Sequence, residues 1–236
     1  MTFRYELDSE KPGWSVDDDC VDIKNPDLCF IFLHGYTSGP EYWDPRIKAI
    51  KNDMRIIKSH KKIVYIRISA PYDPMTIYGG IPKRSFYPFY GRSYGMKNSD
   101  ERIIKNNEDM KIIIDEIKKK YDIEYKNMTL LGFSQGGAVS LILATTIPDY
   151  DGKVVALSTY YPEVENLEII NHKPHILYLH GTNDNILDFD MAKRSYNLIK
   201  KFVHDITFIK LDYIKHEVSI KEIHDHVIPF LISEKK

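Results

Sequence analysis

The amino-acid sequence predicts an α/β fold with a mostly parallel central sheet and helices on both faces. Short apolar runs typical of buried strands alternate along the chain with longer segments whose apolar residues recur at helical spacing. Polar residues follow several of these runs directly, and such sheets bind their ligands at the carboxyl ends of the strands. The length of 236 residues suits one hydrophobic core, so we expect a single domain over residues 1–236.

The expected strands are short and mostly apolar. They cover Phe3–Leu7, Val21–Ile23, Leu28–Leu33, Ile63–Ile68, Met128–Leu131, Lys153–Ser158, His175–Leu179 and Ile206–Leu211. The run Leu28–Leu33 is apolar at every position, which indicates a central strand that is covered on both faces.

The expected helices have apolar residues close to a period of 3.6 or follow a turn signal. They cover Tyr42–Met54, Ser99–Lys120, the segment behind Ser134, Asp190–Val203 and Glu217–Leu231. Ser99 is expected to cap the second of these helices. The segment Pro71–Asn98 is rich in glycine, proline and aromatic residues, and a loop of this length in a compact domain is usually functional.

The composition argues against several classes of partner. The formal net charge of −1 provides no field that would draw the chain to nucleic acid or to an anionic membrane. The first ten residues are polar and charged, unlike a signal peptide, and no apolar run approaches the roughly 20 residues that span a bilayer. Cys20 and Cys29 do not make a disulfide framework. We therefore expect a soluble, cytoplasmic protein without a transmembrane segment.

No pattern in the sequence predicts a metal or a cofactor. His224 and His226 are two positions apart on an expected helix, so their side chains do not converge on one ion. The sequence contains no Gly-x-Gly-x-x-Gly or Walker pattern that would cradle a phosphate. We expect neither a metal nor a cofactor.

The segment Gly132-Phe133-Ser134-Gln135-Gly136 lies between an expected strand and an expected helix. In that context Gly-x-Ser-x-Gly is a nucleophile elbow, a sharp turn that presents the serine hydroxyl at the edge of the sheet. Side chains two positions before and after the serine would collide with the turn, and glycine avoids this. Ser134 is therefore the candidate nucleophile. The alternative is a glycine-rich turn before a buried helix.

A serine hydroxyl needs a base within hydrogen-bond reach, and an acid usually orients that base. Behind nucleophile elbows the acid precedes the histidine in the chain. Asp184 follows the strand His175–Leu179 and is the preferred acid, with Asp188 second because it falls near a helix start, where capping is its expected role. His216 lies just beyond the strand Ile206–Leu211 and is the preferred base.

The other histidines fit the role of the base less well. His224 and His226 lie inside the last expected helix, and His172, His175 and His180 precede the acid. Two backbone N–H groups are expected to bind the transient oxyanion, those of Gln135 at the helix start and of Tyr36 after the strand Leu28–Leu33. His34 is expected to serve as a structural hydrogen-bonding residue in that second turn.

Several of these segments together resemble a known family, the phospholipase/carboxylesterase group of α/β-hydrolases, which includes the acyl-protein thioesterases. The similar segments occur in the order of the family and cover about three quarters of the chain. They are Phe32–Trp43, Ala70–Phe89, Gly132–Gly137, His180–Asp184 and the histidine at His216. The resemblance implies an α/β-hydrolase fold without a large lid domain. It also implies a nucleophile, acid and base at Ser134, Asp184 and His216, with oxyanion donors at Tyr36 and Gln135.

The resemblance further implies a serine hydrolase that cleaves carboxylic esters or thioesters through an acyl-enzyme. Its substrates would be acyl esters, lysophospholipids or S-acylated proteins. We expect the protein to be a monomer or a homodimer. A hydrolase-fold binding or receptor protein with little turnover is the alternative. Within enzymes, a small-molecule esterase or lysophospholipase is the alternative to a protein deacylase.

The aromatic residues of the long loop are candidate walls for an apolar substrate, because acyl chains gain free energy by leaving water. The candidate wall residues are Phe86, Tyr87, Phe89 and Tyr90. The alternative is that these side chains pack the loop onto the body of the domain.

Overall fold

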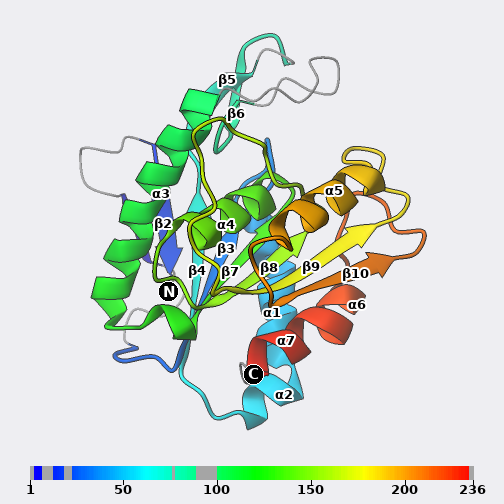
Figure 1. Ribbon diagram of the computed structural model, residues 1–236. Coiled ribbons are helices and arrows are strands. Elements are labelled where there is room, and N and C mark those ends of the chain that lie inside the picture. The colour runs from blue at the N-terminus through cyan, green and yellow to red at the C-terminus, as the bar shows by residue number, and fades with distance from the viewer. Residues whose placement is uncertain (1–2, 7–12, 19–22, 76–77, 89–99, 234–236) are drawn as a thin grey trace.

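The computed structural model describes residues 3–6, 13–18, 23–75, 78–88 and 100–233 (Figure 1). Within these described residues, the main sheet has eight strands in the order β1-β2-β4-β3-β7-β8-β9-β10. The strands are β1 (Phe3–Glu6), β2 (Ser15–Asp18), β3 (Leu28–Leu33), β4 (Ile63–Ser69), β7 (Met128–Phe133), β8 (Lys153–Leu157), β9 (His175–Gly181) and β10 (Ile206–Leu211). β2 pairs antiparallel with β1 and β4, and all pairs from β4 to β10 are parallel. The predicted α/β fold with a mostly parallel central sheet is confirmed.

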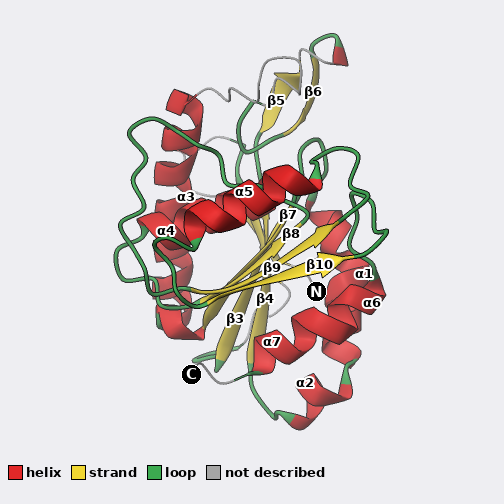
Figure 2. Cartoon of the chain, turned by 45° about the vertical axis from the view of Figure 1, so that its right-hand side comes forward, coloured by secondary structure: helices red, strands yellow, loops and turns green. Residues whose placement is uncertain are grey.

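Helices cover both faces of the sheet (Figure 2). One face carries α3 (Asp100–Tyr121), α4 (Gln135–Thr146) and α5 (Phe189–Ile199). The other carries α1 (Asp44–Asn52), α2 (Met54–Lys58), α6 (Ile220–Glu222) and α7 (Ile228–Ile232). None of the described helices is both long and apolar enough to cross a bilayer.

Strand β3 illustrates why the central strands are apolar at every position. Successive side chains of a strand point to opposite faces of a sheet. Cys29, Ile31 and Leu33 pack into the core beneath α3 and α4, whereas Phe30 and Phe32 pack into the core beneath α1. All five side chains are fully buried. Two cores of this kind hold the sheet between two helical layers.

The second strand differs from the prediction. The expected strand Val21–Ile23 is wrong at Ile23, which lies outside any strand, while residues 21–22 lie outside the described part of the chain. The strand is instead Ser15–Asp18, and its aspartates kept it from being recognised by a pattern of apolar residues. Asp18 is buried and accepts hydrogen bonds from the Lys120 ammonium and the Tyr121 hydroxyl. The Asp18 carboxylate is therefore stabilised by partners distant in the sequence, which a local pattern of apolar residues does not reveal.

The predicted helix Tyr42–Met54 is divided in the structure. A 3₁₀ turn over Pro40–Trp43 leads into α1, and α2 begins anew at Met54. Asp53 separates the two helices because its extended backbone breaks the first helix and its carboxylate accepts the Arg55 N–H at 2.8 Å, which caps the second.

The last helix also begins later than predicted, at Ile220 instead of Glu217. Ser219 and Glu222 form a capping box there, a reciprocal pair of hydrogen bonds that marks a helix start. A π-helical turn over Ile223–Val227 connects α6 to α7. The preceding helix, α5, ends at Ile199 rather than at the predicted Val203.

The segment predicted as the long loop Pro71–Asn98 contains a hairpin. Strands β5 (Tyr72–Met75) and β6 (Ile81–Arg84) pair antiparallel and project beyond the main sheet (Figure 2). Residues 76–77 and 89–99 are not described, so the predicted cap Ser99 also lies outside the described residues.

Candidate active site

The turn from β7 into α4 places Ser134 in a strained backbone conformation. Ser134 has φ of 53° and ψ of −119°, in the positive-φ range that L-residues rarely adopt. A Cβ on Gly132 would lie 2.1 Å from the Gly136 carbonyl oxygen, and a Cβ on Gly136 would lie 2.2 Å from that of Leu33. Glycine is therefore required at both positions, as the motif predicts.

Three side chains from three strand ends meet in a line of hydrogen bonds. His216 Nε2 lies 3.0 Å from Ser134 Oγ, and His216 Nδ1 lies 2.7 Å from Asp184 Oδ2. A carboxylate only accepts, so the Nδ1–H donates to Asp184 and Nε2 accepts from the Ser134 hydroxyl. The sequence-predicted residues Ser134, Asp184 and His216 thus come together at the carboxyl edge of the parallel sheet.

Asp184 is buried within its own loop. Its Oδ1 accepts the N–H groups of Ile186 at 2.9 Å and Leu187 at 2.8 Å. Burial raises the pKa of this carboxyl, but the hydrogen bonds from His216, Leu187 and Ile186 outweigh burial and hold it below its ordinary value. Asp184 is therefore ionised near neutral pH and can stabilise a positive charge on the His216 ring.

The second candidate acid has a different place. Asp188 accepts the Met191 N–H at 2.8 Å and caps α5, as predicted for it.

Two of the other histidines have partners away from Ser134. His224 lies 2.9 Å from the Asp53 carboxylate, in the helical layer that contains α2. His180 is buried and donates from Nε2 to the Leu187 carbonyl at 2.8 Å. Neither histidine makes a hydrogen bond to Ser134.

The His216 ring rests against a stack of aromatic and cationic groups. Its centroid lies 5.0 Å from that of Phe133, and Phe133 stacks on Tyr42 at 4.6 Å. The Arg46 guanidinium lies over the Tyr42 ring, 3.8 Å from its centroid, and donates from Nε and Nη2 to the Val218 carbonyl, at 3.1 and 2.7 Å. The guanidinium thus ties α1 to the loop that carries the base. Sequence reasoning missed Arg46, since no local pattern signals a bond to a carbonyl 172 positions away.

The two proposed oxyanion donors come from neighbouring turns. Gln135 is the first residue of α4, where N–H groups have no acceptor within the helix. Tyr36 follows β3, and the next residue, Thr37, has φ of 60° and donates its N–H to the Arg84 carbonyl at 3.0 Å. The close approach of Gly136 to Leu33 brings the two turns together.

His34 makes two hydrogen bonds that fix its role in the turn. Its Nδ1–H donates to the Gly35 carbonyl at 2.8 Å, and its Nε2 accepts the Ala70 N–H at 3.1 Å. Burial lowers the pKa of His34 to about 4, so the ring is neutral near pH 7. His34 is therefore a structural hydrogen-bonding residue, as the sequence predicts.

The predicted substrate-wall residues divide into two groups. Phe86 and Tyr87 are 5% and 0% exposed, and the Tyr87 hydroxyl lies 2.9 Å from that of Tyr160. This burial favours the alternative in which both side chains pack the loop onto the domain. Phe89 and Tyr90 lie outside the described residues.

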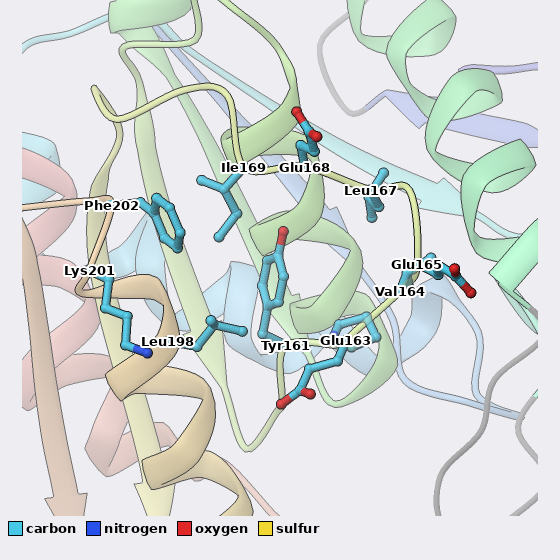
Figure 3. Close-up of a pocket in the computed structure, with 11 residues that line it drawn as sticks. Tyr161, Glu163, Val164, Glu165, Leu167, Glu168, Ile169, Leu198, Lys201 and Phe202 are labelled. Carbon is cyan, nitrogen blue, oxygen red and sulfur yellow. The ribbon is translucent and has the colours of Figure 1, made fainter.

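A pocket of about 770 Å³ lies between residues 161–169 and the end of α5. Apolar side chains gather in it around the Tyr161 ring, among them Leu198, Ile169 and Phe202 (Figure 3). None of the triad side chains lines this pocket, so it is separate from the candidate site. Among the described residues, no group of three His, Cys, Asp or Glu side chains could hold a metal ion.

The fold and the strained serine turn define an α/β-hydrolase. Residues 22–231 match the model of the phospholipase/carboxylesterase family, and the chain belongs to that family. It is an esterase or thioesterase by class.

Curated relatives agree with this family. The chain is 32% identical to acyl-protein thioesterase 1 of Debaryomyces hansenii over 205 residues, which are 83% of this chain and 86% of the relative. It is 30% identical to the protein of the same name from Emericella nidulans, over 86% of this chain and 89% of the relative.

Solved structures show the same fold. Arabidopsis thaliana SOBER1 matches with a TM-score of 0.75 at 20% identity, over 86% of this chain and 97% of that one. Zea mays acyl-protein thioesterase 2 matches with a TM-score of 0.70 at 18% identity, over 92% and 96% of the two chains.

The neutral state of His34 makes stability depend on pH. The pKa of His34 falls from 6.5 to about 4 on folding, so between these values the unfolded chain binds more protons than the folded one. Stability therefore decreases as pH is lowered from about 6.5 to 4. His34→Gln should reduce the slope of unfolding free energy against pH by up to about 1.4 kcal/mol per unit in this window. Guanidinium unfolding of both proteins between pH 4 and 7.5 measures the slopes, and equal slopes would contradict the assignment.

Proposed function

We propose that this protein hydrolyses acyl esters or thioesters through an acyl-enzyme at Ser134, with His216 as base and Asp184 as its orienting acid. The observation that carries the proposal is the pair of contacts at His216, 3.0 Å to Ser134 Oγ and 2.7 Å to Asp184 Oδ2. Both distances lie within the reach needed for proton transfer and for orientation of the base.

In the first half-reaction His216 Nε2 takes the hydroxyl proton as Ser134 Oγ bonds to the substrate carbonyl carbon. The carbonyl oxygen becomes an oxyanion, which the backbone N–H groups of Tyr36 and Gln135 stabilise. The tetrahedral intermediate then collapses, the bond to the leaving oxygen or sulfur breaks, and His216 returns its proton to the leaving group. Ser134 now carries the acyl group.

In the second half-reaction a water molecule replaces the leaving group. His216 takes a proton from the water as its oxygen attacks the acyl carbon, and the same oxyanion donors act again. Collapse releases the carboxylic acid and returns the proton to Ser134 Oγ. Throughout, the ionised Asp184 holds the imidazole in the tautomer that accepts at Nε2.

The relatives support a more specific substrate class. Two of them are named acyl-protein thioesterase 1, so we propose S-acylated proteins as substrates. Small acyl esters and lysophospholipids are the second candidate, because residue 36, a proposed oxyanion donor, is a bulky tyrosine that would narrow a groove for a long acyl chain.

A fluorophosphonate probe tests the nucleophile. It should label the wild-type protein covalently at Ser134, because the base at 3.0 Å activates that hydroxyl. Ser134→Ala should lose labelling and at least about 10³-fold in kcat while retaining its circular dichroism spectrum. Intact-protein and peptide mass spectrometry give the readout. A folded wild type that remains unlabelled would favour a binding protein with little turnover.

Matched substitutions separate the two candidate acids. Asp184→Asn should lower kcat by about 10²-fold to 10⁴-fold, because an amide cannot hold the His216 tautomer as a carboxylate does. Asp188→Asn removes one carboxylate oxygen from the cap of α5 and should leave kcat within about twofold, at a cost of about 1 kcal/mol or less in stability. Steady-state kinetics and thermal unfolding check both, and the reverse ranking would assign the acid to Asp188.

A set of substrates tests the acyl specificity. We expect an S-palmitoylated peptide to be cleaved with a higher kcat/KM than p-nitrophenyl acetate, since a long acyl chain gains free energy by leaving water. Among p-nitrophenyl esters, kcat/KM should increase as the acyl chain becomes longer. A maximum at the shortest ester would instead identify a small-molecule esterase.

A further inference from the structure

The side chain of Gln135 makes a paired contact with the segment Ser85–Tyr87. Its Oε1 accepts the Phe86 N–H at 3.0 Å, and its Nε2 donates to the Tyr87 carbonyl at 2.6 Å. Ser85 Oγ also donates to the Tyr87 carbonyl, at 2.5 Å. The carboxamide therefore holds the segment as a neighbouring strand would, with one donor and one acceptor.

The orientation of this carboxamide follows from its partners. The Phe86 N–H can only donate and the Tyr87 carbonyl can only accept, so Oε1 faces the first and Nε2 the second. Gln135 is 2% exposed, so water does not replace these bonds if they are lost. A buried polar group without its partner costs roughly 1–3 kcal/mol, which makes the contact a strong constraint.

The segment and the residue before it, Arg84, also contact the turn after β3. The Arg84 carbonyl accepts the Thr37 N–H at 3.0 Å, next to the proposed donor Tyr36. The Phe86 ring packs against the His34 ring with a centroid distance of 4.9 Å. Arg84 is itself restrained, since its Nη1 donates to the Ala70 carbonyl at 2.7 Å. Residues 84–87 therefore contact both turns that supply the proposed oxyanion donors.

We propose that the Gln135 side chain is a positioning residue that fixes the distance between the two backbone donors. It clamps Ser85–Tyr87 to the start of α4. The preceding residue, Arg84, accepts the Thr37 N–H and thereby restrains the neighbouring Tyr36 N–H. Gln135 thus contributes its own N–H as one donor and sets the place of the other through its side chain. The inference rests on the proposed acyl-enzyme mechanism and adds a role that the mechanism alone does not require.

The expected size of the effect follows from the geometry of oxyanion stabilisation. Each donor must lie about 2.7–3.1 Å from the oxygen, and loss of one donor typically costs about 10²-fold to 10³-fold in kcat. A displaced donor retains part of its effect. We therefore expect loss of the clamp to lower kcat about 10-fold to 100-fold without a matching change in KM.

The test compares Gln135→Met with the wild type. Methionine has nearly the same length and removes both hydrogen bonds to the segment. We expect kcat to fall about 10-fold to 100-fold, with KM within about threefold. The inhibition constant of an acyl trifluoromethyl ketone should rise by the same factor as kcat falls, because its adduct with Ser134 Oγ places an oxyanion between the two donors. If Gln135→Met does not fold, Gln135→Asn, whose carboxamide is one methylene too short to reach the segment, takes its place.

Asn171→Leu is the matched control. Asn171 is also 2% exposed, and its Nδ2 donates to the carbonyls of Ala144 and Tyr150, both at 2.7 Å, at the other end of α4. This variant should lose thermal stability to a similar extent while kcat and the ketone inhibition constant stay within about twofold of the wild type. If Gln135→Met behaves like this control, the side chain serves only the stability of the fold and the inference is overturned.

The result also distinguishes the clamp from the proposed function. A wild type that turns over esters and is labelled at Ser134, with a Gln135→Met variant of unchanged kcat, overturns the clamp alone. A wild type without labelling or turnover overturns the acyl-enzyme mechanism, and the clamp falls with it.

Discussion

The site depends on one approach of backbone to backbone, at the turn between β7 and α4. α4 can lie against the end of β3 only because residue 136 has no side chain, since a Cβ there would stand 2.2 Å from the Leu33 carbonyl oxygen. The same approach forces Ser134 to a φ of 53° and brings the start of α4 beside the turn that contains Tyr36. The Thr159 hydroxyl, 2.6 Å from the Ser134 carbonyl, secures the turn from the β8 side. The same close approach of the two backbones therefore positions both the nucleophile and the proposed oxyanion donors.

The sequence predicts those parts of the molecule that depend on local patterns. Leu28–Leu33 is apolar because both faces of β3 are buried, and the glycines around Ser134 are visible because the turn tolerates no Cβ. The candidate acid and base could be chosen because each lies in the loop that follows a strand. In contrast, the strand Ser15–Asp18 carries a buried carboxylate, Asp18, whose partners Lys120 and Tyr121 lie in α3, and no periodicity in an aspartate run indicates this.

Aromatic content alone did not distinguish packing from substrate contact. Phe86 and Tyr87 looked like a substrate wall, yet both are buried and anchor the chain to Trp14, His34 and Tyr160. The polar partner of this segment is the Gln135 carboxamide. Gln135 lies inside the nucleophile motif, which predicts a role for its backbone N–H but none for its side chain. Arg46 is a similar case, because its bonds to the Val218 carbonyl exist only once α1 and the loop after β10 are folded together.

Ser134 and His216 follow strands that differ in how firmly the sheet holds them. Ser134 follows β7, which is flanked by a strand on each side, whereas the loop with His216 follows β10, which ends the sheet and pairs only with β9 in the described strand order. Outer strands separate from a sheet at a lower free energy than inner ones. Heating should therefore detach the imidazole from the hydroxyl before the central strands melt. Thermal inactivation would then be an early, local and reversible event, and the Arg46 tether would set the temperature at which it begins.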